Sequence, residues 1–109
     1  MSRDWRIYVE DIVACCDRIT KYTPGMSKDA FLCDNKTYDA VVRNLEIIGE
    51  AAKHVPDDVR ALMPLIDWRG AAGLRDMLAH AYFGIDDDIV WDVIINKIPE
   101  LREQLSAIS

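Results

Sequence analysis

Apolar residues recur every three or four positions along most of the chain, which is the spacing of amphipathic helices that bury one face. The pattern predicts a first helix over residues 4–21, which Thr23-Pro24-Gly25 ends. Ser27 can start another helical segment, because a serine hydroxyl accepts a hydrogen bond from a free backbone amide. The apolar face of the first helix consists of Trp5, Val9, Ile12, Cys16 and Ile19.

A second long helix is predicted from Lys36 to about His54, where apolar residues again follow helical spacing. It ends before Pro56, because proline cannot continue a helix from its interior. A short helix is expected over residues 57–63, before Pro64. The apolar face of the second long helix consists of Tyr38, Val41, Leu45, Ile48 and Ala52.

The last third of the chain predicts two further helices. Asp67 is expected to cap a helix that runs to about Tyr82 and ends before Gly84. Asp86 is expected to cap the final helix, whose first turn carries two more aspartates at the positive end of the helix dipole. Pro99 should kink this helix or restart it. The buried stripe predicted for it consists of Ile89, Val93, Ile98, Leu101 and Leu105.

The chain shows no run of alternating apolar and polar residues bounded by turns, so a β-sheet is not expected. The elements predict an all-α fold, an antiparallel bundle of four main helices plus a short connecting helix. A length of 109 residues fits a single domain over residues 1–109. No apolar run approaches the roughly 18 residues of a membrane span, and the first residues lack the apolar stretch of a signal peptide. We therefore expect a cytoplasmic protein that makes no membrane contact.

Cysteine content and charge narrow the chemistry. Cys15, Cys16 and Cys33 are odd in number and lack a metal-binding spacing, so they are expected to be small core residues in a reducing compartment. The net charge of −6 argues against a general affinity for nucleic acid. Any nucleic-acid site would therefore be a local patch. The candidates for a basic strip are Arg43, Lys53, Arg69 and Arg75.

The strongest candidate for chemistry is the octad at residues 75–82, Arg-Asp-Met-Leu-Ala-His-Ala-Tyr. Arginine is a permanently charged, fork-shaped phosphate binder, and histidine transfers protons near neutral pH. On an ideal helix, Arg75 and Tyr82 share one flank, whereas His80 lies about 140° away on the other. The face expected to be buried consists of Ala71, Leu74, Met77, Leu78 and Ala81.

This geometry does not bring Arg75 and His80 to one point on a single straight helix. The arginine could bend round, the helix could distort near Gly84, or Arg75 of one chain could work beside His80 of another. Two-fold dimers are the commonest oligomers, so we expect a homodimer that brings both pairs together.

The pattern alone also permits a purely structural interpretation. An arginine five residues before a histidine is a common arrangement, and a histidine near a helix C-terminus is favoured by the helix dipole without any function. Glu46 and Glu50 stand one turn apart on the second long helix and could form an acid pair, although exposed ion pairs with Arg43 or Lys53 are the simpler interpretation.

The octad resembles the R-x-x-x-x-H-x-Y signature of the HepT-type toxins, small helical ribonucleases of the HEPN superfamily that are also known as the DUF86 family. Residues 43–52 resemble the second-helix motif of that family, and Asp67-Trp68-Arg69 resembles the approach to its catalytic helix. Residues 82–86 and Val90-Trp91 resemble the continuation, so the resemblance runs from the first helix to about Leu105. It implies a HEPN-like bundle.

The resemblance also implies an activity. The chain would be the toxin of a type VII toxin–antitoxin pair, a metal-independent endoribonuclease in which Arg75 binds phosphate and His80 is general base or acid. Asp76 stands at a position that varies in the superfamily, where asparagine is frequent, and it would orient Arg75 or His80. Single-stranded or looped RNA would be the substrate.

The expected partner is a MntA-type minimal nucleotidyltransferase, the antitoxin, which would transfer AMP from ATP to Tyr82. Apart from AMP attached at Tyr82, no cofactor and no metal is expected. The active unit would be a homodimer or a larger hetero-oligomer with the antitoxin. An alternative is a non-catalytic, nucleotide-binding helical adaptor that docks a nucleotidyltransferase, which the acidic charge favours. A third possibility is that this chain is itself the antitoxin.

Overall fold

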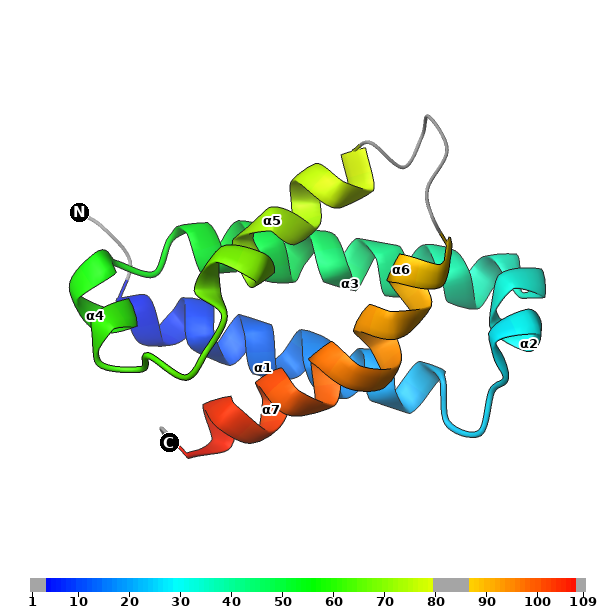
Figure 1. The fold of residues 1–109 in the computed structure, drawn as a ribbon, viewed down its shortest axis with the longest axis horizontal. Helices are drawn as coiled ribbons and strands as arrows, with labels where there is room; N and C mark the ends of the chain where they lie inside the picture. Colours follow the sequence, from blue (N-terminus) through cyan, green and yellow to red (C-terminus); the bar gives the residue numbers. More distant parts are fainter. Residues whose placement is uncertain (1–3, 80–86, 108–109) are drawn as a thin grey trace.

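The computed structural model describes residues 4–79 and 87–107, and every regular element within these ranges is helical (Figure 1). The all-α prediction is confirmed. None of the described helices is both long and apolar enough to cross a membrane. The elements are α1 (Trp5–Tyr22), α2 (Lys28–Cys33), α3 (Asn35–Lys53), α4 (Asp57–Ala61), α5 (Trp68–Ala79), α6 (Asp87–Asp92), the π-helical segment η2 (Val93–Lys97) and α7 (Ile98–Ser106).

Side-chain caps fix the starts of four helices. Asp4, Ser27 and Asp34 accept hydrogen bonds from the backbone amides of α1, α2 and α3 at 3.0 to 3.1 Å. Asp67 accepts one from the backbone amide of Gly70 at 2.8 Å. The caps predicted at Ser27 and Asp67 are therefore confirmed. The predicted cap at residue 86, and the predicted extension of α5 to residue 82, lie outside the described residues.

The helices form a bundle in which α1 and α3 run side by side in opposite directions, with α7 along the other side of α1 (Figure 1). The helix α5 crosses α3 obliquely, and α6, η2 and α7 together form the last long helix. Two short helices, α2 and α4, lie in the connections at opposite ends of α3. Four main helices are thus confirmed within the described residues, and the helical segment predicted to start at Ser27 is α2, a second short helix in addition to α4.

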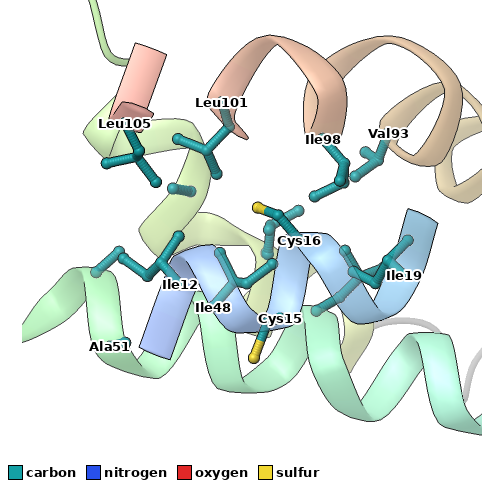
Figure 2. Packing of buried hydrophobic residues seen from close by; sticks show 14 of the residues in the cluster. Ile12, Cys15, Cys16, Ile19, Ile48, Ala51, Val93, Ile98, Leu101 and Leu105 are labelled. Carbon is teal, nitrogen blue, oxygen red and sulfur yellow. The ribbon is translucent and has the colours of Figure 1, made fainter. Parts of the chain in front are cut away.

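The core lies where α1, α3 and the last helix meet, and Figure 2 shows their apolar side chains interdigitated. Each fully buried aliphatic side chain stabilises the fold by about 1.5–3 kcal/mol through its removal from water. The largest fully buried side chains are Phe31, Ile12, Ile19, Leu45, Ile48, Ile98 and Leu105.

The cysteines divide between core and surface. Cys15 and Cys16 are buried, and burial raises the pKa of Cys16 to about 12, so its thiol stays protonated at neutral pH. Cys33 is exposed, so the expectation that it is a core residue is wrong. It is the last residue of α2, a helix of six residues whose only fully buried side chain is Phe31.

The last helix also departs from the predicted stripe. Ile89 is 46% exposed, whereas Val90 is buried, so the prediction that Ile89 is buried is wrong. Both residues are compatible with Val93 at helical spacing, but only Val90 is aligned with the buried Ile94 one turn later. The break expected at Pro99 takes the form of the π-helical segment η2, which ends two residues before it.

Candidate functional site

The helix that carries the octad touches α3 through very small groups. A Cβ atom added to Gly49 would lie 3.0 Å from the backbone nitrogen of Arg75 and 3.4 Å from the backbone oxygen of Ala71. Real Cβ atoms rarely have such close neighbours, so glycine at position 49 lets the two backbones approach. The residue that begins the octad therefore lies directly against the C-terminal part of α3, at Gly49.

The neighbour of this glycine binds the octad's arginine. Glu50 Oε2 accepts a hydrogen bond from Arg75 Nη1 at 2.5 Å, which makes an ion pair between α3 and α5. Both side chains are about half exposed, at 48% and 58% respectively. A guanidinium has five N–H donors in a rigid fork, and this bond uses one of them. Arg75 can therefore be held by Glu50 and still offer donors to a ligand.

The same carboxylate reaches a histidine. Glu50 Oε1 lies 3.6 Å from His54 Nε2, one turn further along the chain. The His54 ring is stacked on Tyr8 of α1, with ring centroids 5.0 Å apart and planes inclined by 18°. We call these four residues, Tyr8, Glu50, His54 and Arg75, the Arg75 cluster. It joins three helices at the surface.

A second, longer contact flanks the cluster. Lys53 Nζ lies 4.0 Å from Asp76 Oδ1, and the Asp76 side chain is 75% exposed. Among the described residues, the recorded partner of Asp76 is thus Lys53, while the recorded partner of Arg75 is Glu50. The role predicted for Asp76, to orient Arg75 or His80, stays a prediction.

The structure describes only some of the predicted site residues. Arg75 and Asp76 are exposed on α5, as expected from the helical pattern. His80 and Tyr82 lie outside the described residues. On the opposite side of α5, Ala71, Leu74 and Leu78 are buried and Met77 is partly buried, which confirms the predicted apolar face within the described part of the helix. Ala81 falls outside that part.

The four residues of the predicted basic strip do not lie together in the structure. Lys53 and Arg75 both lie where α3 and α5 meet. Arg43, by contrast, is ten residues before Lys53, or about 15 Å back along α3. Arg69 is about 9 Å before Arg75 on α5 and about 120° round the helix. The cationic part of the site is therefore small and local.

Sequence reasoning did not assign Glu50, His54 and Tyr8 to the site. The helical spacing predicts an ion pair of Glu50 with Arg43 or Lys53 on its own helix, whereas the observed partner, Arg75, is 25 residues away. The residue before Glu50 could have indicated the site. Gly49 stands in the interior of a long helix, where glycine is unfavourable, and such a glycine usually marks a close packing contact.

Within the described residues, no group of three or more histidines, cysteines or acidic residues is arranged to hold a metal ion. The chemistry that is visible consists of an oriented, half-exposed guanidinium with an aromatic pair beside it. Such a guanidinium is suited to a phosphate or another oxyanion, which it can bind through two parallel N–H donors.

Comparison with known proteins identifies the family of the chain. Residues 12–108 match the family model described as ribonuclease HepT-like. The chain belongs to the HepT-like ribonuclease family. The resemblance expected from the octad and the second-helix motif is thereby confirmed over most of the chain.

Three relatives show how closely the HepT-like chain matches known proteins. A Thermococcus cleftensis protein named as a probable ribonuclease HepT is 45% identical over 102 residues, 94% of this chain and 93% of the relative. A Methanocaldococcus jannaschii protein named as a candidate RNase is 43% identical over 107 residues, 98% of this chain and 88% of the relative. Another protein named in that way, from Caldanaerobacter subterraneus subsp. tengcongensis, is 40% identical over 103 residues, 94% of this chain and 92% of the relative. No solved structure matches the chain significantly.

Proposed function

We propose that this HepT-like chain is an endoribonuclease that cleaves RNA without a metal ion and acts as the toxin of a type VII toxin–antitoxin pair in the cytoplasm. Its family and the names of its relatives support a ribonuclease. The observation that carries the proposal is the placement of Arg75. Its guanidinium is anchored by Glu50, half exposed, and located at the start of the octad.

In the proposed reaction, Arg75 binds the phosphate that is to be cleaved. Two of its N–H donors contact non-bridging oxygens, and they stabilise the additional negative charge as the phosphorus becomes five-coordinate. Glu50 acts as a positioning residue, because its hydrogen bond limits the rotamers that the long arginine side chain can adopt. The fixed guanidinium then pays little entropy on binding.

His80 is the proposed proton-transfer group. The 2′-oxygen loses its proton and attacks phosphorus, the bond from phosphorus to the 5′-oxygen breaks, and the 5′-oxygen gains a proton. The products are a 2′,3′-cyclic phosphate and a 5′-hydroxyl. General acid–base catalysis of this kind is typically worth about 100- to 10,000-fold. In the proposed homodimer, Arg75 of one protomer works beside His80 of its partner.

The proposed partner is a MntA-type nucleotidyltransferase that inactivates the toxin at Tyr82. The phenolic oxygen would attack the α-phosphorus of ATP, so that an O–P bond forms, the bond to the β-phosphate breaks and pyrophosphate leaves. Tyr82→Phe should keep ribonuclease activity but resist inactivation by the partner. Mass spectrometry that still finds AMP on this variant would overturn the assignment of Tyr82.

The test of the proposal is an RNA cleavage assay with purified protein in the presence of EDTA. Arg75→Ala and His80→Ala should each lower cleavage by at least about 100-fold. Arg69→Ala is the matched control, since it removes an exposed arginine from the same helix without touching the Arg75 cluster. If wild-type protein cuts no RNA, or if Arg75→Ala and His80→Ala cut as fast as wild type, the proposal is wrong.

The same assay decides the second candidate, a non-catalytic adaptor that docks a nucleotidyltransferase. The net charge of −6 favours this candidate, because an acidic surface repels RNA. An adaptor would bind the nucleotidyltransferase and show no cleavage, and expressing it alone would not slow cell growth. A toxin would slow growth, and Arg75→Ala and His80→Ala would abolish that effect.

A further inference from the structure

The Arg75 cluster contains a pair of aromatic rings that the proposed reaction does not use. The ring of His54 lies parallel to that of Tyr8 at stacking distance, and its Nε2 edge is near Glu50. Even so, the His54 side chain is 53% exposed. Because Tyr8 covers one face of the imidazole and Glu50 is near one edge, we infer that a ligand would contact the opposite face.

The exposed ring is close to the phosphate-binding group. A single carboxylate, that of Glu50, contacts both His54 Nε2 and Arg75 Nη1. The imidazole and the guanidinium are therefore separated by no more than the width of one carboxylate and its two contacts. A nucleotide whose phosphate lies on Arg75 can bring its own base, or that of its neighbour, onto His54.

The acidic character of the protein makes such a contact useful. A chain with a net charge of −6 gains little affinity from general attraction to phosphates, and the cations that the described residues bring to this site are Lys53 and Arg75. Stacking of bases on aromatic rings contributes affinity that does not depend on net charge. It also suits single-stranded RNA, whose bases are free to leave their neighbours.

We propose that His54, supported from behind by Tyr8, is a stacking site for a base of single-stranded RNA next to the phosphate held by Arg75. The inference rests on the proposed ribonuclease function and adds a base-binding subsite to it. Tyr8 fixes the plane of the imidazole, so the ring is ordered before RNA arrives and loses little freedom on binding.

The test measures binding of a short single-stranded 2′-O-methyl RNA that carries 2-aminopurine at several positions. Without a free 2′-hydroxyl the probe cannot be cleaved, and the fluorescence of 2-aminopurine is quenched when it stacks on an aromatic ring. His54→Ala should weaken binding by about fivefold or more and reduce the quenching. His54→Phe should bind within about twofold of wild type, because phenylalanine keeps the ring and removes the nitrogens. Tyr22→Ala, at the other end of α1, is the control for loss of an exposed aromatic residue.

Two results would overturn the inference. Wild-type affinity in His54→Ala would show that no base depends on this ring, and a loss in His54→Phe equal to that in His54→Ala would show that the imidazole acts through charge or proton transfer. Thermal melts of each variant verify that it is folded. The proposed function is tested separately on unmodified RNA. If wild type cleaves, Arg75→Ala does not and His54→Ala binds normally, only the stacking site is wrong.

Discussion

Within the described residues, two arginine–carboxylate pairs join different helices, and in both a guanidinium donates to a partly exposed carboxylate. Arg102 Nε donates to Asp17 Oδ1 at 2.8 Å and links α7 to α1, while Arg75 Nη1 donates to Glu50 Oε2 at 2.5 Å and links α5 to α3. Both pairs are partly exposed: the arginine and carboxylate side chains are 38% and 57% exposed in the Arg102 pair, and 58% and 48% exposed in the Arg75 pair. Exposed pairs of this kind contribute only about 0–1 kcal/mol to stability.

Their surroundings differ. The charges of Asp17 and Arg102 both act on the buried thiol of Cys16, so this pair lies at the edge of the apolar core. The Arg75 pair lies instead beside the glycine contact at Gly49, with a histidine on the other side of its carboxylate. The same two types of group therefore lie at the edge of the core in the Asp17–Arg102 pair and hold a cation at the solvent in the Arg75 pair. The neighbours of a salt bridge, more than its length, indicate what it does.

The largest difference should appear when each carboxylate is neutralised. Glu50→Gln should lower the rate constant of RNA cleavage by about tenfold or more, since the guanidinium loses the partner that orients it. Asp17→Asn should leave cleavage within about twofold of wild type and lower stability by up to about 1 kcal/mol. Single-turnover cleavage and thermal melting measure the two effects.

Glu46→Gln controls for charge in this experiment, because it removes a negative charge one turn earlier on the same helix. Neutralising any surface carboxylate strengthens attraction to RNA, so Glu46→Gln should affect binding only slightly and cleavage not at all. Equal cleavage rates in Glu50→Gln and Glu46→Gln would contradict the positioning role of Glu50.

A smaller effect is expected from the glycine beneath the arginine. Gly49→Ala places a methyl group 3.0 Å from the backbone of Arg75, so α5 must shift by a few tenths of an ångström. We expect cleavage to fall several-fold, whereas stability changes little, because alanine favours the helix by up to about 1 kcal/mol. Gly73→Ala on α5 is the matched control.

A Cβ atom at Gly73 has no atom within 4 Å among the described residues. Gly73→Ala should therefore raise the melting temperature through helix propensity alone, by the equivalent of about 0.5–1 kcal/mol, and leave cleavage unchanged. If the two alanine variants cleave RNA at the same rate, the close contact at Gly49 does not control the placement of Arg75.

A still smaller effect is expected on the rate of thiol labelling. It should change when the Asp17–Arg102 pair is broken, and stay the same when the Glu50–Arg75 pair is broken. At pH 8, a thiol with a pKa of about 12 is ionised to roughly one part in ten thousand, so Cys16 should react only after the structure opens. Exposed Cys33 should react at once. Asp17→Asn should accelerate labelling of Cys16 by up to about fivefold, since its pair closes that part of the core. Glu50→Gln should not change the rate, and a comparable acceleration in both variants would refute the distinction.

The smallest effect concerns the caps of the helices that carry the two carboxylates. The amide of Thr37 and then its hydroxyl hold the pKa of Asp34 below its ordinary value of 3.8, and the amide of Arg6 does the same for Asp4. A carboxyl with a lowered folded pKa stabilises the fold above its ordinary pKa and loses that contribution as the pH falls through the lowered value.

The Asp34→Asn variant tests this sign. Its melting temperature should differ most from that of wild type above about pH 4, and the difference should shrink on acidification towards pH 2. Asp4→Asn should show a pH dependence of the same sign, since the amide and the guanidinium of Arg6 both lower the pKa of Asp4. A difference that does not change with pH would show that the caps act only as neutral hydrogen-bond acceptors.

Local patterns in the sequence were sufficient for most of the fold. Helical spacing and capping residues placed α1, α3 and the start of α5 correctly, because those signals depend on residues within a few positions of one another. The choice between Ile89 and Val90 could not be made in this way. Both are apolar and adjacent, and only the packing of α6 against the rest of the bundle decides which is buried.

Only part of the candidate site could be predicted from the sequence. Arg75 could be identified from its motif, but the residues that surround it come from α1 and α3 and are brought together by the oblique crossing of α5 over α3. Helical spacing does not encode crossing angles between helices; these depend on which ridges and gaps meet. The glycine before Glu50 marks the crossing, but its partner helix becomes evident only in three dimensions.

The π-helical segment before Pro99 has an evolutionary consequence. In η2 the amide of Ile98 donates to the carbonyl of Val93, five residues back, so this turn holds one residue more than an α-helical turn. Such a turn is equivalent to the insertion of a single residue, here in a helix that also accommodates a proline. Among relatives, we expect a one-residue gap between positions 93 and 97 to coincide with the loss of Pro99. The inserted residue and the proline would then be inherited as one unit.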